Sequence, residues 1–330
     1  MNQDAQLSPS DPKHPSTADL SLSVVVPAYN EEEVLPELFR RTTAVLDALP
    51  YRYEIVFVDD GSSDRTVEMM KKLRAQHPQV SVVQLSRNFG KEIALTAGLD
   101  HASGDAVVAI DADLQDPPEV IPQLVEKWRE GADMVYAQRR VREGETWLKK
   151  ASAHVFYRVM HRFGPVKLPR DTGDFRLMSR RVIDGVKQLR ERHRFMKGLF
   201  AWVGYRQVAV LYDRDPRSAG KTKWNYWQLW NLSVEGVTSF TVAPLRLAAY
   251  LGFLSTLFAF ALGGWIFFSD ESTAGDLAIL AAVLFLGGVQ LISLGIIGEY
   301  LGRIFNETKN RPLYLTQNVA PSNLKENSAQ

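Results

Sequence analysis

The sequence predicts an α/β fold, with a largely parallel sheet that carries helices on both faces, followed by a C-terminal two-helix transmembrane hairpin. Three observations lead to this fold class. Short apolar runs alternate with amphipathic segments in the first half of the chain, acidic residues gather where these runs end, and two long uncharged stretches lie near the C-terminus. The chain has 330 residues, of which 45% are hydrophobic, so it can bury a sizeable core.

Five apolar runs have the length and composition of short strands, and four segments between them have helical periodicity. The predicted strands are residues 22–26, 54–58, 80–85, 106–110 and 134–137. The predicted helices are residues 34–49, 66–76, 92–102 and 119–130. Strands and helices that alternate in this way form β-α-β units, whose strands lie parallel in one sheet.

Two stretches near the C-terminus, residues 247–268 and 277–298, contain no Asp, Glu, Lys or Arg. As helices they would each reach roughly 33 Å, which is long enough to cross a bilayer. A pair of buried core helices is the alternative, although uncharged stretches of this length are rare in soluble domains. The link between them is acidic and their outer flanks are basic, so the positive-inside rule places both flanks and the large N-terminal region in the cytoplasm.

Composition predicts five parts of the chain. We expect a disordered leader at residues 1–19, which are polar and lack the apolar core of a signal peptide. The other parts are a globular domain at 20–222, an interfacial amphipathic segment at 223–245, the hairpin at 246–304 and a cytoplasmic tail at 305–330. The interfacial segment contains three Trp and one Tyr, which favour the headgroup region, and packing against the globular domain is the alternative for one or two of them.

Composition also excludes several functions. The chain has no cysteine, which excludes disulfides, thiolate metal sites and cysteine nucleophiles. Its formal net charge of +1 gives no indication of a nucleic-acid partner. No G-x-G-x-x-G follows the first strand, so the dinucleotide fingerprint is absent. Gly220-Lys221-Thr222 looks like the end of a phosphate-binding loop, but Asp215 stands where that motif needs glycine.

Polar side chains follow three of the predicted strands at the point where each strand ends. The ends read Pro27-Ala28-Tyr29-Asn30-Glu31, Asp59-Asp60-Gly61-Ser62 and Asp111-Ala112-Asp113. Because sheets of this kind bind ligands at the carboxyl ends of their strands, we expect these residues to converge. Two carboxylates one residue apart can hold a divalent cation against a diphosphate, which indicates a nucleotide-sugar site.

Some of these acids have structural alternatives. A D-x-D sequence is also common in loops, and turn or N-cap duty is the alternative for Asp59, Asp60 and Asp64. Asp116 precedes Pro117 and stands three residues before Glu119, a pattern that predicts a helix cap rather than a third metal ligand.

Taken together, the motifs resemble those of family-2 glycosyltransferases of the polyprenyl-phosphate type, which are related to dolichol-phosphate mannose synthase. The strand-end motifs VVVPAYNE (24–31), VDDGS (58–62) and DADLQDPP (111–118) carry this likeness. The segments RNFGK (87–91), GDFRLMSR (173–180), FMKG (195–198) and GEYLGR (298–303) are similar to those of bactoprenol glucosyltransferases that use UDP-glucose. The likeness covers roughly residues 20–315, and Thr222 departs from it because the family usually has serine there.

The resemblance implies a GT-A fold, an inverting reaction and a role for each motif. Asp111, Asp113 and Gln115 would surround a Mg²⁺ or Mn²⁺ ion that acts as a Lewis acid on the UDP leaving group. Asp174 would lie near the acceptor and, with Asp111 and Asp113, complete the catalytic set. The nucleotide-sugar pocket would be formed by Pro27, Tyr29, Asn30, Glu31, Asp59, Asp60, Lys91, Asp111, Ala112, Asp113, Arg217 and Lys223. The lipid phosphate would be held by Arg139, Lys149 and Lys150, for which a solvated basic face is the alternative.

These roles predict transfer of a hexose, glucose by the resemblance, from a UDP-sugar to undecaprenyl phosphate at the cytoplasmic face of a bacterial inner membrane. The lipid-linked sugar would serve the modification of a surface glycan such as O-antigen. The resemblance further implies a homotetramer and a separate flippase. One alternative is a processive polysaccharide synthase, which normally needs a Q-x-x-R-W motif and a multispan channel. The other is a non-catalytic membrane scaffold with a sugar-nucleotide fold, which the intact acidic strand ends disfavour.

Overall fold

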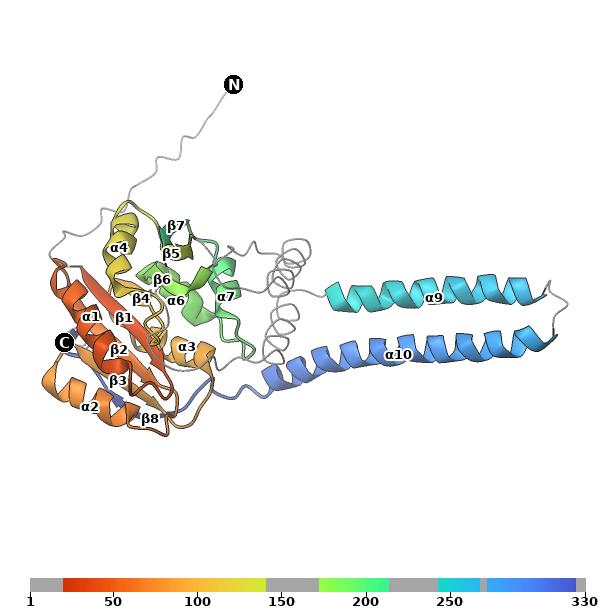
Figure 1. Ribbon diagram of the computed structural model, residues 1–330, viewed down its shortest axis with the longest axis horizontal. Coiled ribbons are helices and arrows are strands. Elements are labelled where there is room, and N and C mark those ends of the chain that lie inside the picture. The colour runs from red at the N-terminus through yellow and green to blue at the C-terminus, as the bar shows by residue number, and fades with distance from the viewer. Residues whose placement is uncertain (1–19, 141–171, 214–242, 268–271, 325–330) are drawn as a thin grey trace, which may run out of the picture.

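The computed structural model describes residues 20–140, 172–213, 243–267 and 272–324. An eight-stranded sheet lies at the centre of the N-terminal domain, and two long helices project from this domain as a hairpin (Figure 1). The α/β class with a C-terminal helix hairpin is therefore confirmed.

The sheet has the strand order β7-β5-β6-β4-β1-β2-β3-β8. Its strands are β1 (Ser21–Ala28), β2 (Arg52–Asp59), β3 (Val80–Leu85), β4 (Ala106–Ala109), β5 (Met134–Arg139), β6 (Thr172–Ser179), β7 (Gln207–Tyr212) and β8 (Thr316–Ala320). The pairings show that only β6 and β8 run against the other described strands, so the sheet is largely parallel. All five strands predicted from the sequence are present, and β6, β7 and β8 were not predicted.

Helices cover both faces of the sheet, as expected. The helices of the N-terminal domain are α1 (Leu35–Asp47), α2 (Thr66–Gln76), α3 (Lys91–His101), the short 3-10 helix η1 (Pro118–Val120), α4 (Ile121–Arg129), α6 (Arg180–Gln188) and α7 (Met196–Trp202). Alternate residues of β1 enter two different core clusters: Leu22, Val24 and Val26 pack with α1, α2 and α4, whereas Val25 packs with α3, α6 and α7. Burial on both faces explains why the central strands are continuous apolar runs.

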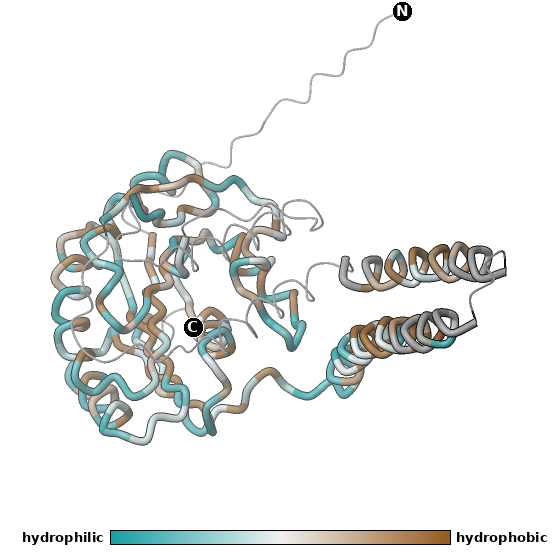
Figure 2. Tube along the Cα trace, turned by 45° about the vertical axis from the view of Figure 1, so that its right-hand side comes forward, coloured by the Kyte–Doolittle hydropathy of each residue, from teal (hydrophilic) through white to brown (hydrophobic). Residues whose placement is uncertain are grey.

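The hairpin consists of α9 (Ala243–Phe267) and α10 (Ser272–Thr308). Figure 2 shows hydrophobic residues along both helices, where large side chains such as Phe260 and Leu291 are exposed. In the described part of the chain, one helical stretch, Phe285–Thr308, is long and apolar enough to cross a membrane, and Ala248–Ala261 is a shorter apolar stretch. An exposed apolar surface of this extent is typical of association with a membrane.

The chain after the hairpin differs from the expected tail at residues 305–330. Helix α10 continues to Thr308, and the chain then returns to the sheet, where β8 pairs antiparallel with β3. Beyond β8, the buried Ser322 hydroxyl donates to the carboxylate of Glu54. The sequence TQNVA of β8 has little apolar character, so its strand conformation depends on the free edge of β3, which offers unpaired backbone groups.

Candidate active site

The candidate site lies at the carboxyl ends of four adjacent strands, β4, β1, β2 and β3. Each of the loops that follow these strands contains one residue with a positive φ angle: Asn30 (55°), Gly61 (72°), Gly90 (97°) and Leu114 (57°). A positive φ is costly for a leucine, and the buried side chain of Leu114 anchors that turn in the core. The acidic turn between Asp111 and Asp113 is therefore part of a fixed strand end.

The loops after β1 and β2 are joined by hydrogen bonds that involve Asn30 and Glu31, which the resemblance assigned to the nucleotide pocket. The Asn30 amide oxygen accepts a hydrogen bond from the Ser63 backbone N–H (2.8 Å), and the Asn30 N–H donates to the Ser62 hydroxyl (3.0 Å). The Glu31 N–H donates to the Thr66 hydroxyl (2.9 Å). Pro27 lies inside β1, and Tyr29 is 39% exposed beside these loops. Tyr29, Asn30 and Glu31 thus follow the carboxyl end of β1, beside the loop that follows β2.

Asp59 and Asp60 lie at the end of β2, but their side chains have different partners. Asp59 is fully buried, and its Oδ1 accepts the Ser62 N–H (3.1 Å), while Oδ2 has no hydrogen-bond partner among the described residues. A buried carboxylate oxygen without a donor is costly, so Oδ2 marks Asp59 as an acceptor that lacks a partner among the described residues. Asp60 instead accepts the backbone N–H groups of Phe89 (2.7 Å) and Gly90 (2.9 Å), and burial raises its pKa.

The contacts of Asp60 fix the loop that leads into α3. A Cβ atom at Gly61 would lie 2.6 Å from backbone atoms of Arg87 and Asn88, so only glycine allows the β2 and β3 loops to approach this closely. Lys91 is the first residue of α3 and follows directly on this loop. Asp60 therefore shapes the site by holding the segment that carries Lys91.

Lys91 bridges two carboxylates at the centre of the site. Its Nζ lies 2.7 Å from the carboxylate of Asp111 and 2.7 Å from Oδ2 of Asp174. Burial by itself would lower the pKa of Lys91, but the two carboxylates raise this pKa well above its usual range. Burial would likewise raise the pKa of Asp174, but Lys91, Lys197 and Arg176 hold it well below its usual range. Lys91 and Asp174 therefore form an ionised pair at neutral pH, and the carboxylate of Asp111 lies on the other side of the ammonium group.

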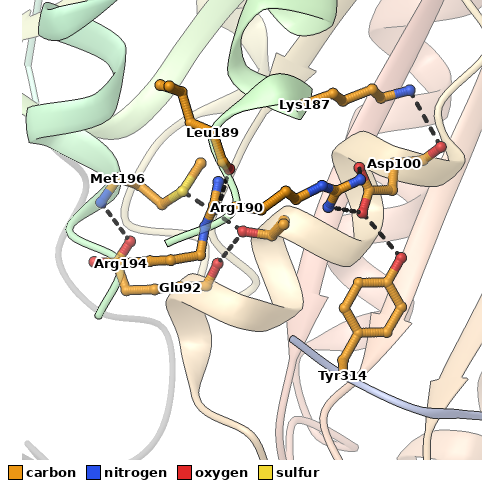
Figure 3. Close-up of polar contacts among 9 residues, drawn as sticks. Glu92, Asp100, Lys187, Leu189, Arg190, Arg194, Met196 and Tyr314 are labelled. Atoms are coloured by element: carbon orange, nitrogen blue, oxygen red, sulfur yellow. Dashed lines mark hydrogen bonds and ion pairs between the residues drawn. The ribbon is translucent and has the colours of Figure 1, made fainter. Parts of the chain in front are cut away.

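Two buried ionisable residues near Asp174, Glu92 and Arg176, were not predicted from the sequence. Glu92 accepts the backbone N–H of Met196 (3.1 Å; Figure 3), and burial, with the nearby charge of Asp174, raises its pKa to about 7. Arg176 is buried, lies over the Phe200 ring (4.2 Å to the centroid) and donates to the Gly173 carbonyl (2.9 Å). Arg176 lies within a recognised motif, but nothing in its spacing indicates that a strand would carry this charge into the interior.

A second cluster forms around Arg139 at the end of β5. Arg139 Nε donates to the Tyr212 hydroxyl (3.4 Å), and this hydroxyl donates to Oδ1 of the buried Asp116. Burial would lower the pKa of Arg139, but Tyr212, Asp116 and Asp111 raise it. The prediction that Asp116 caps a helix is wrong, because η1 begins without a side-chain cap and Asp116 instead binds a tyrosine of β7.

The oxygen atoms at the acidic turn are suitable ligands for a divalent cation. Asp111 and Asp113 offer carboxylate oxygens on the two sides of the buried Ala112, and Gln115 follows, with its backbone N–H donating to Asp113 Oδ1 (3.2 Å). The described residues contain no group of three His, Cys, Asp or Glu side chains that could hold a metal by themselves. Mg²⁺ is usually held by one or two protein carboxylates, with substrate phosphates and water as the other ligands, so two acids suffice.

Several predicted residues cannot be placed. Lys149, Lys150, Arg217 and Lys223 lie outside the described residues, as does the aromatic segment at 224–230. The described part of the site thus contains the acidic turn, the Lys91 bridge, the β1 and β2 loops and the Arg139 cluster.

Comparison with known proteins identifies the family. The pattern of glycosyl transferase family 2 matches residues 23–186, and that of the GtrB C-terminal hairpin matches residues 243–304. The chain is 54% identical over 304 residues to the uncharacterized glycosyltransferase sll0501 of Synechocystis sp., covering 91% of this chain and 96% of that protein. It is 46% identical over 303 residues to the bactoprenol glucosyl transferase of Shigella phage SfV, covering 91% and 99%. The chain belongs to glycosyl transferase family 2.

The family membership confirms three expectations: the protein is a glycosyltransferase, its catalytic domain is of the family-2 type, and a two-helix hairpin follows that domain. The individual site residues are not tested by these comparisons, and their roles stay predictions. Among solved structures, S. aureus TarS 1–349 in complex with UDP-GlcNAc is similar to the chain with a TM-score of 0.46 and 18% identity, covering 84% of this chain and 73% of that one.

Proposed function

We propose that this glycosyltransferase moves glucose from UDP-glucose to a polyprenyl phosphate at the cytoplasmic face of a membrane. The observation that carries the proposal is the 46% identity, over 99% of its length, to a protein named bactoprenol glucosyl transferase. The site supports it, because acidic residues at the strand ends suit a nucleotide diphosphate with its metal, and Arg139 lies beside them as a candidate partner for a second phosphate. The tetramer and the flippase implied by the resemblance stay predictions.

The donor would lie across the strand ends. In this proposal the loops after β1 and β2, with Tyr29, Asn30, Glu31 and Asp59, hold the uridine, and the buried, unpaired Asp59 Oδ2 would accept from one of its N–H or O–H groups when the donor binds. Asp111, Asp113 and Gln115 would hold Mg²⁺ or Mn²⁺, and the bound ion would stabilise the charge of the UDP leaving group. Arg139 binds the lipid phosphate, together with Lys149 or Lys150.

The acceptor chemistry removes the need for a strong general base. A phosphate monoester has a second pKa of about 6, so its oxygen is largely ionised at pH 7 and can attack the anomeric carbon directly. The bond from that carbon to the phosphate oxygen forms as the bond to UDP breaks, and UDP leaves with the electron pair. Direct displacement inverts the anomeric centre. Asp174, whose pKa is lowered by Lys91, then acts as a counter-ion of Lys91 and not as a proton acceptor.

Purified protein should convert UDP-α-glucose and a short-chain polyprenyl phosphate into a β-linked glucosyl lipid phosphate, with UDP released in equal amount. A panel of other UDP-hexoses tests the sugar, and the anomeric coupling constant in the NMR spectrum tests the linkage. Release of UDP without any lipid product, or an α-linked product, would contradict the proposal. In the same assay Arg139→Ala should raise the KM for the lipid phosphate while UDP binding, measured by calorimetry, stays unchanged.

The membrane topology can be tested because the chain has no cysteine. We propose that α9 and α10 both span the membrane and that the catalytic domain is cytoplasmic, because the link between the helices is acidic and their flanks are basic. A cysteine at Ser272 should react with a membrane-impermeant maleimide in intact cells. A cysteine at Ala75, which is exposed on α2, should react only after permeabilisation. Labelling of both positions from the same side would contradict the two-span arrangement.

A further inference from the structure

The chain that leaves the membrane hairpin contacts the segment that carries Lys91. Ser86, directly after β3, donates its N–H to the carbonyl of Leu315 (2.9 Å). The Tyr314 hydroxyl donates to Oδ2 of Asp100 (3.1 Å), which lies in the last turn of α3. The loop and the helix that carry Lys91 occupy residues 86–101. The chain that follows the hairpin, residues 309–320 (the post-hairpin segment), therefore contacts both ends of this unit.

Asp100 of α3 is contacted by residues of α6, of the loop after α6 and of the post-hairpin segment (Figure 3). Arg190 donates to both of its carboxylate oxygens (2.8 and 3.2 Å), Lys187 donates to its backbone carbonyl (3.2 Å), and Tyr314 approaches from the post-hairpin chain. Burial and the charge of Asp100 raise the pKa of Tyr314, so its hydroxyl stays a hydrogen-bond donor at neutral pH. The C-terminal end of α3 is therefore held from two sides.

Packing reinforces these hydrogen bonds. Tyr314 and Val319 pack against the core cluster that contains Leu95 and Leu99 of α3, and Phe89 of the loop packs against the same cluster. The β3–β8 pairing extends this contact, with Val83 opposite Val319 and Gln84 opposite Asn318. The post-hairpin segment is thus fixed to the catalytic domain by main-chain, side-chain and apolar contacts.

Helix α3 connects the contact at Asp100 to Lys91 in the candidate site. Helix α3 is eleven residues long, roughly 16 Å, and carries Asp100 near one end and Lys91 at the other. A Cβ at Gly98 would lie 2.2 Å from Val25 Cγ1, so α3 is pressed closely onto β1. Because the residues of a packed helix are coupled, a displacement of its Asp100 end would also displace Lys91, whose Nζ lies 2.7 Å from Asp111.

We propose that Tyr314 is a positioning residue for the donor site, which acts through Asp100 and α3 to place Lys91 against Asp111 and Asp174. The proposal rests on the proposed function, because it concerns the binding of a UDP-sugar at this site. In this proposal the chain that leaves the hairpin is a structural part of the active site. It connects the hairpin to the helix that carries Lys91.

The test compares Tyr314→Phe with Tyr53→Phe. Both wild-type tyrosines donate to an aspartate, since the Tyr53 hydroxyl lies 2.6 Å from Asp47 Oδ1, but Tyr53 contacts neither α3 nor its loop in any described hydrogen bond. Tyr314→Phe should raise the KM for UDP-glucose, and the calorimetric Kd for UDP, by about 3- to 10-fold, which corresponds to the net contribution of one typical protein hydrogen bond. The KM for the lipid phosphate should not change. Tyr53→Phe should leave all three constants unchanged.

A double-mutant cycle separates positioning from general stability. If Tyr314 acts through Lys91, the combination of Tyr314→Phe with Lys91→Arg should weaken UDP binding by less than the product of the two single effects. Independent effects that multiply, or a Tyr314→Phe variant with wild-type UDP affinity, would overturn the proposal. Wild-type protein that binds no UDP at all would instead contradict the proposed function, so the two failures can be told apart.

Discussion

Asp113→Ala is expected to lower the turnover of UDP-glucose by at least about 100-fold while the fold stays intact. The half-buried Asp113 lies in the turn after β4, where its carboxylate accepts the nearby Gln115 N–H (3.2 Å), and it is not part of the hydrophobic core, so its loss removes little packing. In the proposed mechanism its charge holds the cation that stabilises the leaving UDP, an effect that acts in the transition state and therefore lowers kcat.

Two further variants make this result specific. Asp113→Asn keeps an acceptor for the Gln115 N–H but removes the charge, and we expect it to lose nearly as much turnover as Asp113→Ala. Asp47→Ala removes an exposed aspartate that binds Tyr53 and should keep wild-type turnover. Turnover by Asp113→Ala close to the wild-type rate in excess chelator would show that the acidic turn does not hold a catalytic metal.

Lys91→Met is expected to have the second largest effect, with turnover reduced by about 100-fold or more. Without the ammonium group, Asp111 and Asp174 face each other as like charges, and the largely buried Asp174 loses its ion-pair partner. Because the Lys91 side chain is 42% exposed, water compensates part of this loss. We therefore expect the free energy of unfolding to fall by about 1–3 kcal/mol, measured by chemical denaturation.

A second substitution distinguishes an electrostatic role from simple loss of packing. Adding Asp174→Asn to Lys91→Met removes the unpaired buried charge, so stability should recover although turnover stays low. Lys127→Met is the matched control, because Lys127 forms an ion pair with Glu130 on the surface of α4 and should lose neither stability nor turnover. If Lys91→Met kept turnover within a factor of three of wild type, the bridge would have no part in catalysis.

A smaller effect is expected at Asp174. The resemblance places it near the acceptor, and in the structure it pairs with Lys91 and has Lys197 and Arg176 nearby. Asp174→Asn by itself should therefore reduce turnover less than Asp113→Asn, because it removes a partner of Lys91 and leaves the acidic turn intact. External base should not rescue this variant.

The sequence by itself determined the parts of the protein whose signal is local. Strands buried on both faces must be apolar along their length, so β1, β2 and β3 were visible as runs, and α2 begins and ends where its periodicity predicted. The acidic turn was visible because a D-x-D sequence directly followed such a run. The hairpin was visible because a bilayer requires long uncharged stretches.

The tertiary structure alone decided which charges meet and which polar segments become strands. Strand β6 carries Asp174 and Arg176 into the interior, and β8 has a polar sequence, so neither shows the pattern of a strand until its neighbour supplies hydrogen bonds. Lys91 contacts Asp111 and Asp174 only because the start of α3, the end of β4 and the start of β6 lie beside one another. An ion pair between distant residues leaves no periodicity in the sequence, since its energy depends on distance and burial, and only the folded chain sets both.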